Sequence, residues 1–207
     1  MEIEAKFLTR PGIFKKISEL KDIAGYKIKE IIDIKEEDTY LDTEELDLHR
    51  QELSYRIRKQ DNTFLVTLKQ KPVRTGAIYS RIEEEEYIKE EDIPKVYDYS
   101  LNIKPVQEAK KLAEGKKLQK IFTIDKHRKR IVITKGNFMI KLDMDTIQFL
   151  IEGLKEKEHE LEIESKNTPM EEVEKIQGFL KQKFGKKLKP SKRSKYERGL
   201  ALLAKSG

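Results

Sequence analysis

The feature that most constrains this chain is a strict alternation of charged and apolar residues at its N-terminus. Residues 2–7 read EIEAKF. Successive side chains of a β-strand point to opposite faces, so the three charged residues share one face and the three apolar residues share the other. The charged face of an isolated strand ordinarily faces solvent. Here the pattern recurs along the chain, which changes what it predicts.

At least five later segments show the same alternation, with both signs of charge across the set. Such strands can bury their apolar face under helices, and the charged faces meet inside if the sheet closes. The predicted strands are residues 27–34, 36–42 (which continues into a loop), 53–60, 63–70, 78–88, 118–125, 126–134, 138–146 and 159–165. Apolar residues at helical spacing predict helices over about 11–23, 89–114, 168–184 and 194–205.

Length and charge narrow the class of protein. A chain of 207 residues predicts one domain, 1–207, in which 89–116 is a helical insertion. The 44 basic and 38 acidic residues leave a net charge of only +6, which favours an anionic partner without making nucleic acid the expected one. The chain has no cysteine, which excludes disulfides and thiolate chemistry.

The expected location is the cytoplasm. No apolar run approaches the roughly 20 residues that span a bilayer, so no membrane association is expected. The chain starts directly with a charged strand, and no signal peptide is visible.

The charged faces themselves indicate a ligand. Burying unpaired charges costs several kcal/mol each, so a closed barrel of roughly eight such strands must hold water, ions or a charged ligand. Carboxylates without histidine or cysteine partners suit Mg²⁺ or Mn²⁺, and arginine and lysine bind phosphates. Both in one cavity predict a phosphate chain with bridging metal. The predicted inward acids are Glu2, Glu4, Glu83, Glu85, Asp143, Asp145, Glu160, Glu162 and Glu164. The predicted inward bases are Lys6, Arg56, Arg58, Lys69, Arg81, Lys126, Arg128, Lys141 and Lys195.

Ordered motifs over nearly the whole chain carry a family resemblance. The first, ExExK, is Glu2-Ile3-Glu4-Ala5-Lys6, and it is weak evidence alone. The chain resembles the CYTH group of triphosphate tunnel metalloenzymes, which includes class IV adenylate cyclases, thiamine triphosphatases and inorganic triphosphatases. The further matching segments are 38–43 (DTYLDT), 55–58 (YRIR), 67–69 (TLK), 81–85 (RIEEE), 142–143 (LD), 160–164 (ELEIE) and 194–199 (SKYERG).

The resemblance implies an α+β fold: a closed eight-stranded antiparallel β-barrel, the triphosphate tunnel, flanked by helices. The implied metal ligands are Glu2, Glu4, Asp143, Glu160 and Glu162, with Glu83 and Glu85 completing the metal site or orienting basic residues. The implied substrate-binding residues are Lys6, Arg56, Arg58, Lys69, Arg81, Arg128 and Lys195. The implied catalytic residues are Glu2, Glu4, Lys6 and Glu162. Which of Lys126, Arg128 and Arg130 binds phosphate depends on a register that the sequence leaves open.

The leading hypothesis is metal-dependent hydrolysis of a triphosphate-containing small molecule with Mg²⁺ or Mn²⁺. Inorganic triphosphate is the first choice, because the sequence shows no aromatic cluster suited to adenine or thiazolium. The alternatives are a class IV-type adenylate cyclase, which makes cAMP and diphosphate from ATP, and a thiamine or nucleoside triphosphatase. A non-catalytic polyphosphate-binding module is the alternative from another class, and the inward carboxylates argue against it. The resemblance is compatible with a homodimer.

Overall fold

The structure, a computed structural model, describes residues 2–70, 73–75, 78–154 and 156–206; the side chains of Glu2, 73–75, 78–81 and Ser206 lie outside the description. The strands are β1 (Glu2–Leu8), β2 (Asp22–Ile23), β3 (Tyr26–Asp42), β4 (Ser54–Gln60), β5 (Thr63–Lys69), β6 (Val73–Thr75), β7 (Ile78–Arg81), β8 (Glu83–Ile88), β9 (Gln119–Lys135), β10 (Phe138–Leu150), β11 (Lys157–Ser165) and β12 (Lys189–Pro190). The α-helices are α1 (Pro11–Ser18), α2 (Asp47–Arg50), α3 (Ile93–Tyr97), α4 (Lys104–Leu112), α5 (Met170–Phe184) and α6 (Lys195–Ser206). Two 3₁₀ turns, η1 (Glu90–Asp92) and η2 (Gly185–Lys187), complete the list.

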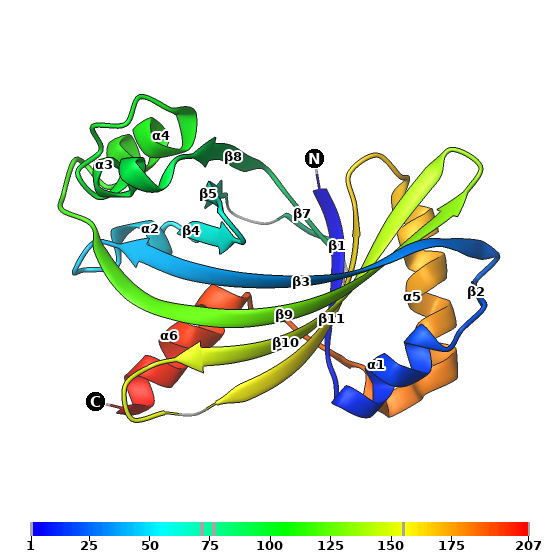
Figure 1. Cartoon of the computed structure of the whole chain (residues 1–207). Coiled ribbons are helices and arrows are strands. Elements are labelled where there is room, and N and C mark those ends of the chain that lie inside the picture. Colours follow the sequence, from blue (N-terminus) through cyan, green and yellow to red (C-terminus); the bar gives the residue numbers. More distant parts are fainter. Residues whose placement is uncertain (1, 71–72, 76–77, 155, 207) are drawn as a thin grey trace.

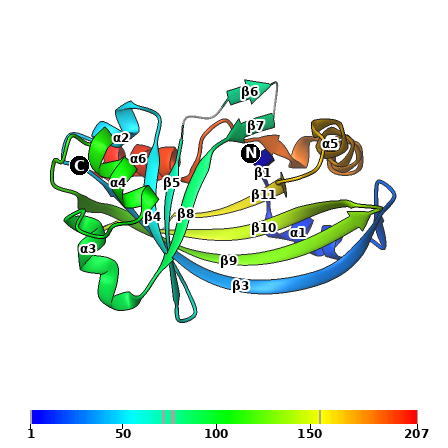
Figure 2. The same ribbon diagram turned by 90° about the horizontal axis from the view of Figure 1, so that it is seen from above.

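One strongly curved antiparallel sheet organises the molecule (Figures 1 and 2). Its strand order is β6-β7-β1-β11-β10-β9-β3-β4-β5-β8, and the short strands β12 and β2 pair with β1 and β3. The two longest strands, β3 and β9, pair from Lys27 opposite Thr134 to Asp42 opposite Gln119. The sequence predicted both as two shorter segments. Each is one continuous strand that crosses the whole molecule.

The sheet is not closed by hydrogen bonds, which corrects the expected closed barrel. β8 pairs only with β5 and lies at one end of the strand order, whereas β7 pairs with β1 near the other end. The chain passes from β7 to β8 through Ile82, so residues 78–88 form two strands, not the one predicted. Among the strands that the structure describes, the covalent chain therefore joins the two sides of the sheet where a ladder is missing.

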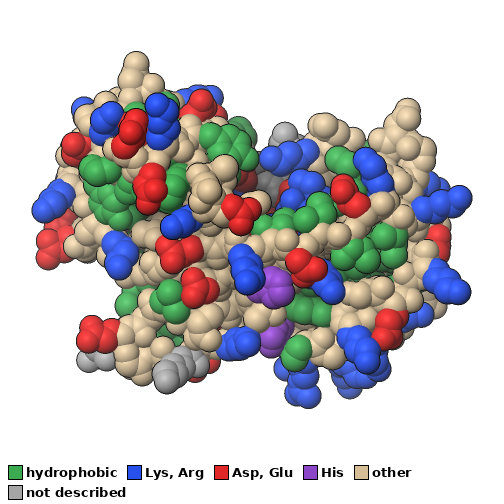
Figure 3. Space-filling model, viewed as in Figure 1, with side chains coloured by type: hydrophobic (Ala, Val, Ile, Leu, Met, Phe, Trp, Pro, Cys, Tyr) green, Lys and Arg blue, Asp and Glu red, His purple; other side chains and the backbone are tan. Residues whose placement is uncertain are grey.

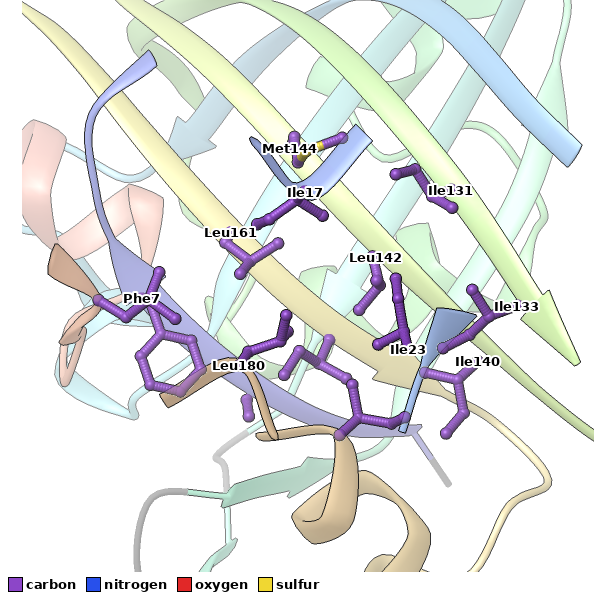
Figure 4. Packing of buried hydrophobic residues seen from close by; sticks show 14 of the residues in the cluster. Phe7, Ile17, Ile23, Ile131, Ile133, Ile140, Leu142, Met144, Leu161 and Leu180 are labelled. Carbon is purple, nitrogen blue, oxygen red and sulfur yellow. The ribbon is translucent and has the colours of Figure 1, made fainter. Parts of the chain in front are cut away.

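Two apolar cores cover the outside of the sheet at opposite ends. Under α1 and α5, one core contains Phe7, Ile17 and Leu180 (Figure 4). Apolar residues at helical spacing on α5 produce this contact, as the pattern predicts. Under α2, α3 and α4, the second core contains Tyr55 and Val106 on the other side of the molecule. Figure 2 shows the two groups of helices well separated.

A third apolar cluster fills one end of the concave interior. Tyr40, Phe122 and Phe149 come from the strands, and Tyr196 comes from α6. The ring centroids of Tyr40 and Tyr196 lie 5.1 Å apart, nearly parallel. Gly199 permits the contact between α6 and the sheet, because a Cβ there would lie 2.1 Å from Phe122 Cζ. We call this cluster the aromatic plug. It covers one end of the space that the charged strands enclose.

Two helix predictions differ from the structure in extent. The helix predicted over 11–23 ends at Ser18, and Asp22 and Ile23 form β2. The 89–116 segment contains η1, α3 and α4, as its helical pattern predicts. No helix formed by the described residues is long and apolar enough to cross a bilayer.

Candidate functional site

A cavity of about 300 Å³ lies inside the curved sheet, bounded at one side by the plug residues Tyr40 and Tyr196. Most of its lining is charged, with ten basic and six acidic side chains among those described. The basic ones are Lys6, Arg56, Arg58, Lys69, Lys126, Arg128, Arg130, Lys141, Lys166 and Lys195. The acidic ones are Glu4, Glu36, Glu83, Glu85, Glu162 and Glu164. The excess of positive charge suits a polyanion, and the interspersed carboxylates suit a cation bound with it.

Arg56 and Arg58 of β4 form one wall around the buried Asp38 of β3. Arg58 donates from Nε and Nη2 to Asp38 at 2.6 and 3.0 Å, and Arg56 Nη1 lies 3.3 Å from Asp38. Burial alone would raise the pKa of Asp38, but both arginines and Lys126 hold it well below its usual value. The Nε of Arg56 is buried and donates to no protein group. The Arg56 side chain also lines the cavity, so its guanidinium charge lies beside any anion bound there.

Lys126 of β9 lies at the floor of the cavity. Its Nζ is 2.6 Å from Glu36 and 3.4 Å from Asp38. Burial is the main cause that lowers its pKa to about 8, and Arg128 and Arg58 lower it further against the opposing effect of the two carboxylates. Lys126 is thus a basic group whose charge changes at moderately alkaline pH.

We expect kcat/KM for a triphosphate, the substrate that the family resemblance implies, to fall about tenfold as pH rises through 8, because Lys126, one of the residues whose phosphate contact the sequence leaves open, then loses its proton. The expected change is a decrease with rising pH, because the Lys126 side chain is a cation below its pKa and neutral above it. Lys126→Arg keeps its charge and should show a flat profile to pH 9.5, whereas Lys126→Met should be flat at the low value. Steady-state rates with Mg²⁺ measure all three. An alkaline fall that persists in Lys126→Arg would contradict the assignment.

Four buried carboxylates at and behind the cavity wall, Asp143, Asp145, Glu160 and Glu162, are paired with arginine and lysine. Arg128 donates to both oxygens of Asp145 at 2.6 and 2.7 Å, and also contacts Glu162 at 3.1 Å and Asp143 at 2.5 Å. Arg130 donates to both oxygens of Asp143 at 2.7 and 2.6 Å. Burial raises the pKa of Asp145, but Arg128 and Lys195 outweigh it and lower the value. All four carboxylates are therefore bound by cations of the protein itself.

Lys195, the first residue of α6, lies at the centre of this network. A capping box fixes the start of the helix: Ser194 Oγ accepts from Glu197 N at 3.1 Å, and Ser194 N donates back to the Glu197 carboxylate at 2.5 Å. The Lys195 ammonium contacts Glu160, and it lies 2.8 Å from Glu162 and 3.1 Å from Asp145. Burial opposes the charged form, yet these carboxylates raise the pKa of Lys195 well above its usual value.

The same three carboxylates have the geometry of a cation site. One oxygen from each of Asp145, Glu160 and Glu162 lies within 4.8 Å of the others. An all-oxygen donor set of this kind fits Mg²⁺ or Mn²⁺ better than softer metals. We call these residues the carboxylate triad.

β1 and β8 supply the carboxylates that face the cavity directly. On β1, Lys6 Nζ lies 3.0 Å from Glu4 and 3.6 Å from Glu162. On β8, Glu83 contacts Lys69, and Glu85 lies 3.6 Å from Lys166. The intervening Glu84 points to the outer face and accepts from Lys104 at 2.7 Å. The four-glutamate run is therefore split between two faces, as the alternation predicts.

The predicted site residues fall into three groups. On the cavity wall lie Glu4, Lys6, Arg56, Arg58, Lys69, Glu83, Glu85, Arg128, Glu162 and Lys195. Behind the wall lie Asp143 and Glu160, both fully buried in ion pairs. The side chains of Glu2 and Arg81 are outside those that the structure describes, although the two residues are opposite one another in the β1–β7 ladder. The roles of all these residues remain predictions.

The sequence did not predict two acidic side chains of this site: Glu36, which lines the cavity, and the buried Asp38, which Arg56 and Arg58 contact. Their segment reads EEDTYLD, which was interpreted as a strand running into a loop. It carries the same signal as the other strands, because Glu36, Asp38 and Tyr40 alternate on one face. Arg130, left open by register, and Lys166 also line the cavity.

One part of the wall is apolar. Tyr87 of β8 is 73% exposed and pairs across the ladder with Leu65 of β5. Ile34, Gln60 and Thr63 line the cavity with them. The sequence showed no aromatic cluster, and the structure brings a single ring together with aliphatic and amide side chains.

On the face shown in Figure 3, acidic and basic side chains are interspersed, and basic side chains gather at the lower right.

Comparisons with known proteins agree with this geometry. The profile of the CYTH domain matches residues 1–200, and a comparison with curated proteins finds no match. A Hippeastrum protein, described as a candidate adenylyl cyclase that reveals a dominant triphosphatase activity, is 19% identical, with a TM-score of 0.72 over 97% of this chain and 96% of that one. A candidate adenylate cyclase from Bacillus halodurans is 22% identical, with a TM-score of 0.66 over 96% of each chain. A Pyrococcus horikoshii protein is 23% identical, with a TM-score of 0.62 over 100% of both chains. At these identities, the likeness to solved structures concerns the fold.

Proposed function

Because this chain belongs to the CYTH domain family, we propose that it is an enzyme that hydrolyses a phosphoanhydride bond of a triphosphate with the help of a divalent metal ion. The observation that carries the proposal is the cavity, where ten basic side chains and six carboxylates meet inside the sheet. A triphosphate has the charge and the length to use both sets. In a module that only binds anions, the carboxylates would repel the ligand and weaken its binding.

The carboxylates that face the cavity are the proposed metal ligands: Glu4, Glu83, Glu85 and Glu162, with Glu2 of the same β1 face. These residues would hold Mg²⁺ or Mn²⁺, which would supply Lewis-acid stabilisation of the phosphate charge and a more acidic water. Asp143 is held by Arg128 and Arg130, which suits it to orienting those arginines. We assign it that role in place of direct metal contact.

The basic side chains lie on two sides of the cavity and would bind the phosphate chain from both. Arg56, Arg58 and Lys69 come from the β4–β5 wall, whereas Lys6 and Arg128 come from the opposite side. A phosphate chain between them is held from both sides, which orients the terminal phosphorus. The same cations neutralise the charge that develops on the leaving group.

Inorganic triphosphate is the proposed substrate, since charge surrounds nearly the whole cavity. The second candidate is an organic triphosphate, used either by a class IV-type adenylate cyclase or by a thiamine or nucleoside triphosphatase. The exposed Tyr87 ring beside Leu65 favours this candidate, because an aromatic or sugar group attached to the phosphates could pack there.

A substrate panel tests both candidates. We expect kcat/KM for tripolyphosphate to exceed that for ATP and thiamine triphosphate by about tenfold with Mg²⁺ or Mn²⁺, because the charged walls contact only phosphate. Chromatography identifies phosphate, diphosphate and cAMP. Tyr87→Ala should leave the tripolyphosphate rate unchanged.

Two outcomes would change the proposal. If cAMP and diphosphate are the main products from ATP and tripolyphosphate is poorly used, the reaction is cyclisation. If tripolyphosphate binds without turnover under every metal condition, the chain is a binding module. A single domain with an insertion at 89–116, a homodimer and a cytoplasmic location stay predictions from the sequence.

A further inference from the structure

The ammonium of Lys195 contacts all three carboxylates of the triad. It touches Glu160 and lies 2.8 Å from Glu162 and 3.1 Å from Asp145. Its side chain is 8% exposed. A divalent cation and this ammonium cannot share the same three oxygens, because their like charges would repel at contact distance in a buried site.

The charges around the triad nearly balance without any metal. The described ion pairs join six carboxylates and five cations in one contiguous network. The carboxylates are Glu4, Asp143, Asp145, Glu158, Glu160 and Glu162, and the cations are Lys6, Arg128, Arg130, Lys195 and Arg198. A divalent ion added to this network would turn its net charge from one negative to one positive. The departure of a cation or the arrival of an anion would therefore favour metal binding at the triad.

Among the cations of this described network, Lys195 is the one that contacts all three triad carboxylates, so its departure would open the triad. Arg128 and Arg130 each hold a carboxylate through two parallel hydrogen bonds, a geometry that a planar guanidinium favours. Arg198 pairs with Glu158 at 2.7 Å and with Glu160 at 2.8 Å, away from the cavity lining. Lys195 is a point charge on a flexible stem, and it lines the cavity.

We propose that Lys195 is the resident cation of the carboxylate triad, and that a divalent ion binds there only when the Lys195 ammonium moves to the phosphate oxygens of a bound triphosphate. The inference rests on the proposed function for the identity of the anion. One lysine then links the two binding events, because the anion draws it out and the metal takes its place. Linkage is reciprocal, so metal raises anion affinity by the same factor.

Mn²⁺ binding in the absence of any phosphate tests the proposal on the full chain. We expect Lys195→Met to bind Mn²⁺ at least tenfold more tightly than the wild type, as measured by calorimetry and by the paramagnetic resonance signal of free Mn²⁺. Lys141→Met is the matched control: Lys141 lines the same cavity but lies 3.4 Å from Glu164 and contacts no triad residue among those described. This control should change Mn²⁺ affinity less than threefold.

Asp145→Asn in the Lys195→Met background should remove the gain. If Lys195→Met does not fold, Lys195→Gln is the substitute variant, because the glutamine amide keeps a hydrogen-bond donor toward the triad. Folded variants that bind Mn²⁺ no more tightly than the wild type, or an equal gain in Lys141→Met, would overturn the proposal.

The proposed function can fail separately, because this measurement contains no substrate. Turnover of tripolyphosphate with no gained Mn²⁺ site would reject only the role of Lys195. A gained site with no turnover would reject only the hydrolase.

Discussion

Glu4→Gln is expected to lower metal-dependent turnover of a triphosphate at least a hundredfold, on the order of 2.7 kcal/mol in activation free energy. The substitution keeps the shape of the side chain and removes the negative charge that a hard cation requires. Glu4 is 4% exposed on the cavity wall, and its carboxylate lies 3.0 Å from Lys6. It contributes no apolar surface to the core, so the fold should survive.

The measurement is a titration of Mg²⁺ and Mn²⁺ at fixed tripolyphosphate, with thermal unfolding to check folding. Glu84→Gln is the matched control. Glu84 lies on β8, which also borders the cavity, but its side chain pairs with Lys104 outside the cavity. EDTA should silence the wild type. Undiminished activity in a folded Glu4→Gln protein would exclude Glu4 as a metal ligand.

Arg128→Ala is expected to lower the free energy of unfolding by about 3–5 kcal/mol. The guanidinium contacts Asp143, Asp145 and Glu162, and the substitution leaves all three carboxylates short of a buried cation. The wild-type pKa values of Asp145 and Glu162 are lowered, so their pairing stabilises the protein above the unfolded-state pKa and is lost as pH falls through the folded-state values.

Urea unfolding at pH 7 and pH 4 measures this effect. Without Arg128, the carboxylates take up protons at higher pH, so the difference from wild type should narrow at pH 4. Lys141→Ala, whose partner Glu164 lies 3.4 Å away at a more exposed position, should cost less than about 1 kcal/mol. If Arg128→Ala also lowered the free energy of unfolding by less than about 1 kcal/mol, water would be taking the place of the guanidinium.

Alternation along the strands predicted side-chain direction well. Glu83 and Glu85 lie on the cavity wall, while Glu84 between them pairs outside, because a pleated strand permits nothing else. The helical spacing of α5 was equally informative. These features are local, and a single sequence contains them.

Partners across the sheet are not local, and there the prediction was weaker. The period-two pattern predicts which face of the sheet a residue occupies, but it does not predict which strand is paired beside it. The break at Ile82 therefore could not be seen, nor could the pairing of Asp143 with Arg130. The plug was missed for a related reason: Tyr40 and Phe122 read as ordinary strand residues until α6 is placed against them.

The break in the ladder at Ile82 has a mechanical consequence. Elsewhere around the cavity, widening the wall would cost backbone hydrogen bonds, but β8 and β1 are not paired with each other. Here the covalent chain through Ile82 joins β7 to β8, and Lys166, just after β11, lies 3.6 Å from Glu85. Widening the cavity along this line would break no strand pairing among the described residues, so we expect the cavity to change its girth here while β3 and β9 stay rigid. Amides of β8 should exchange hydrogen faster than those of β9, and a ligand that grips both walls should slow them.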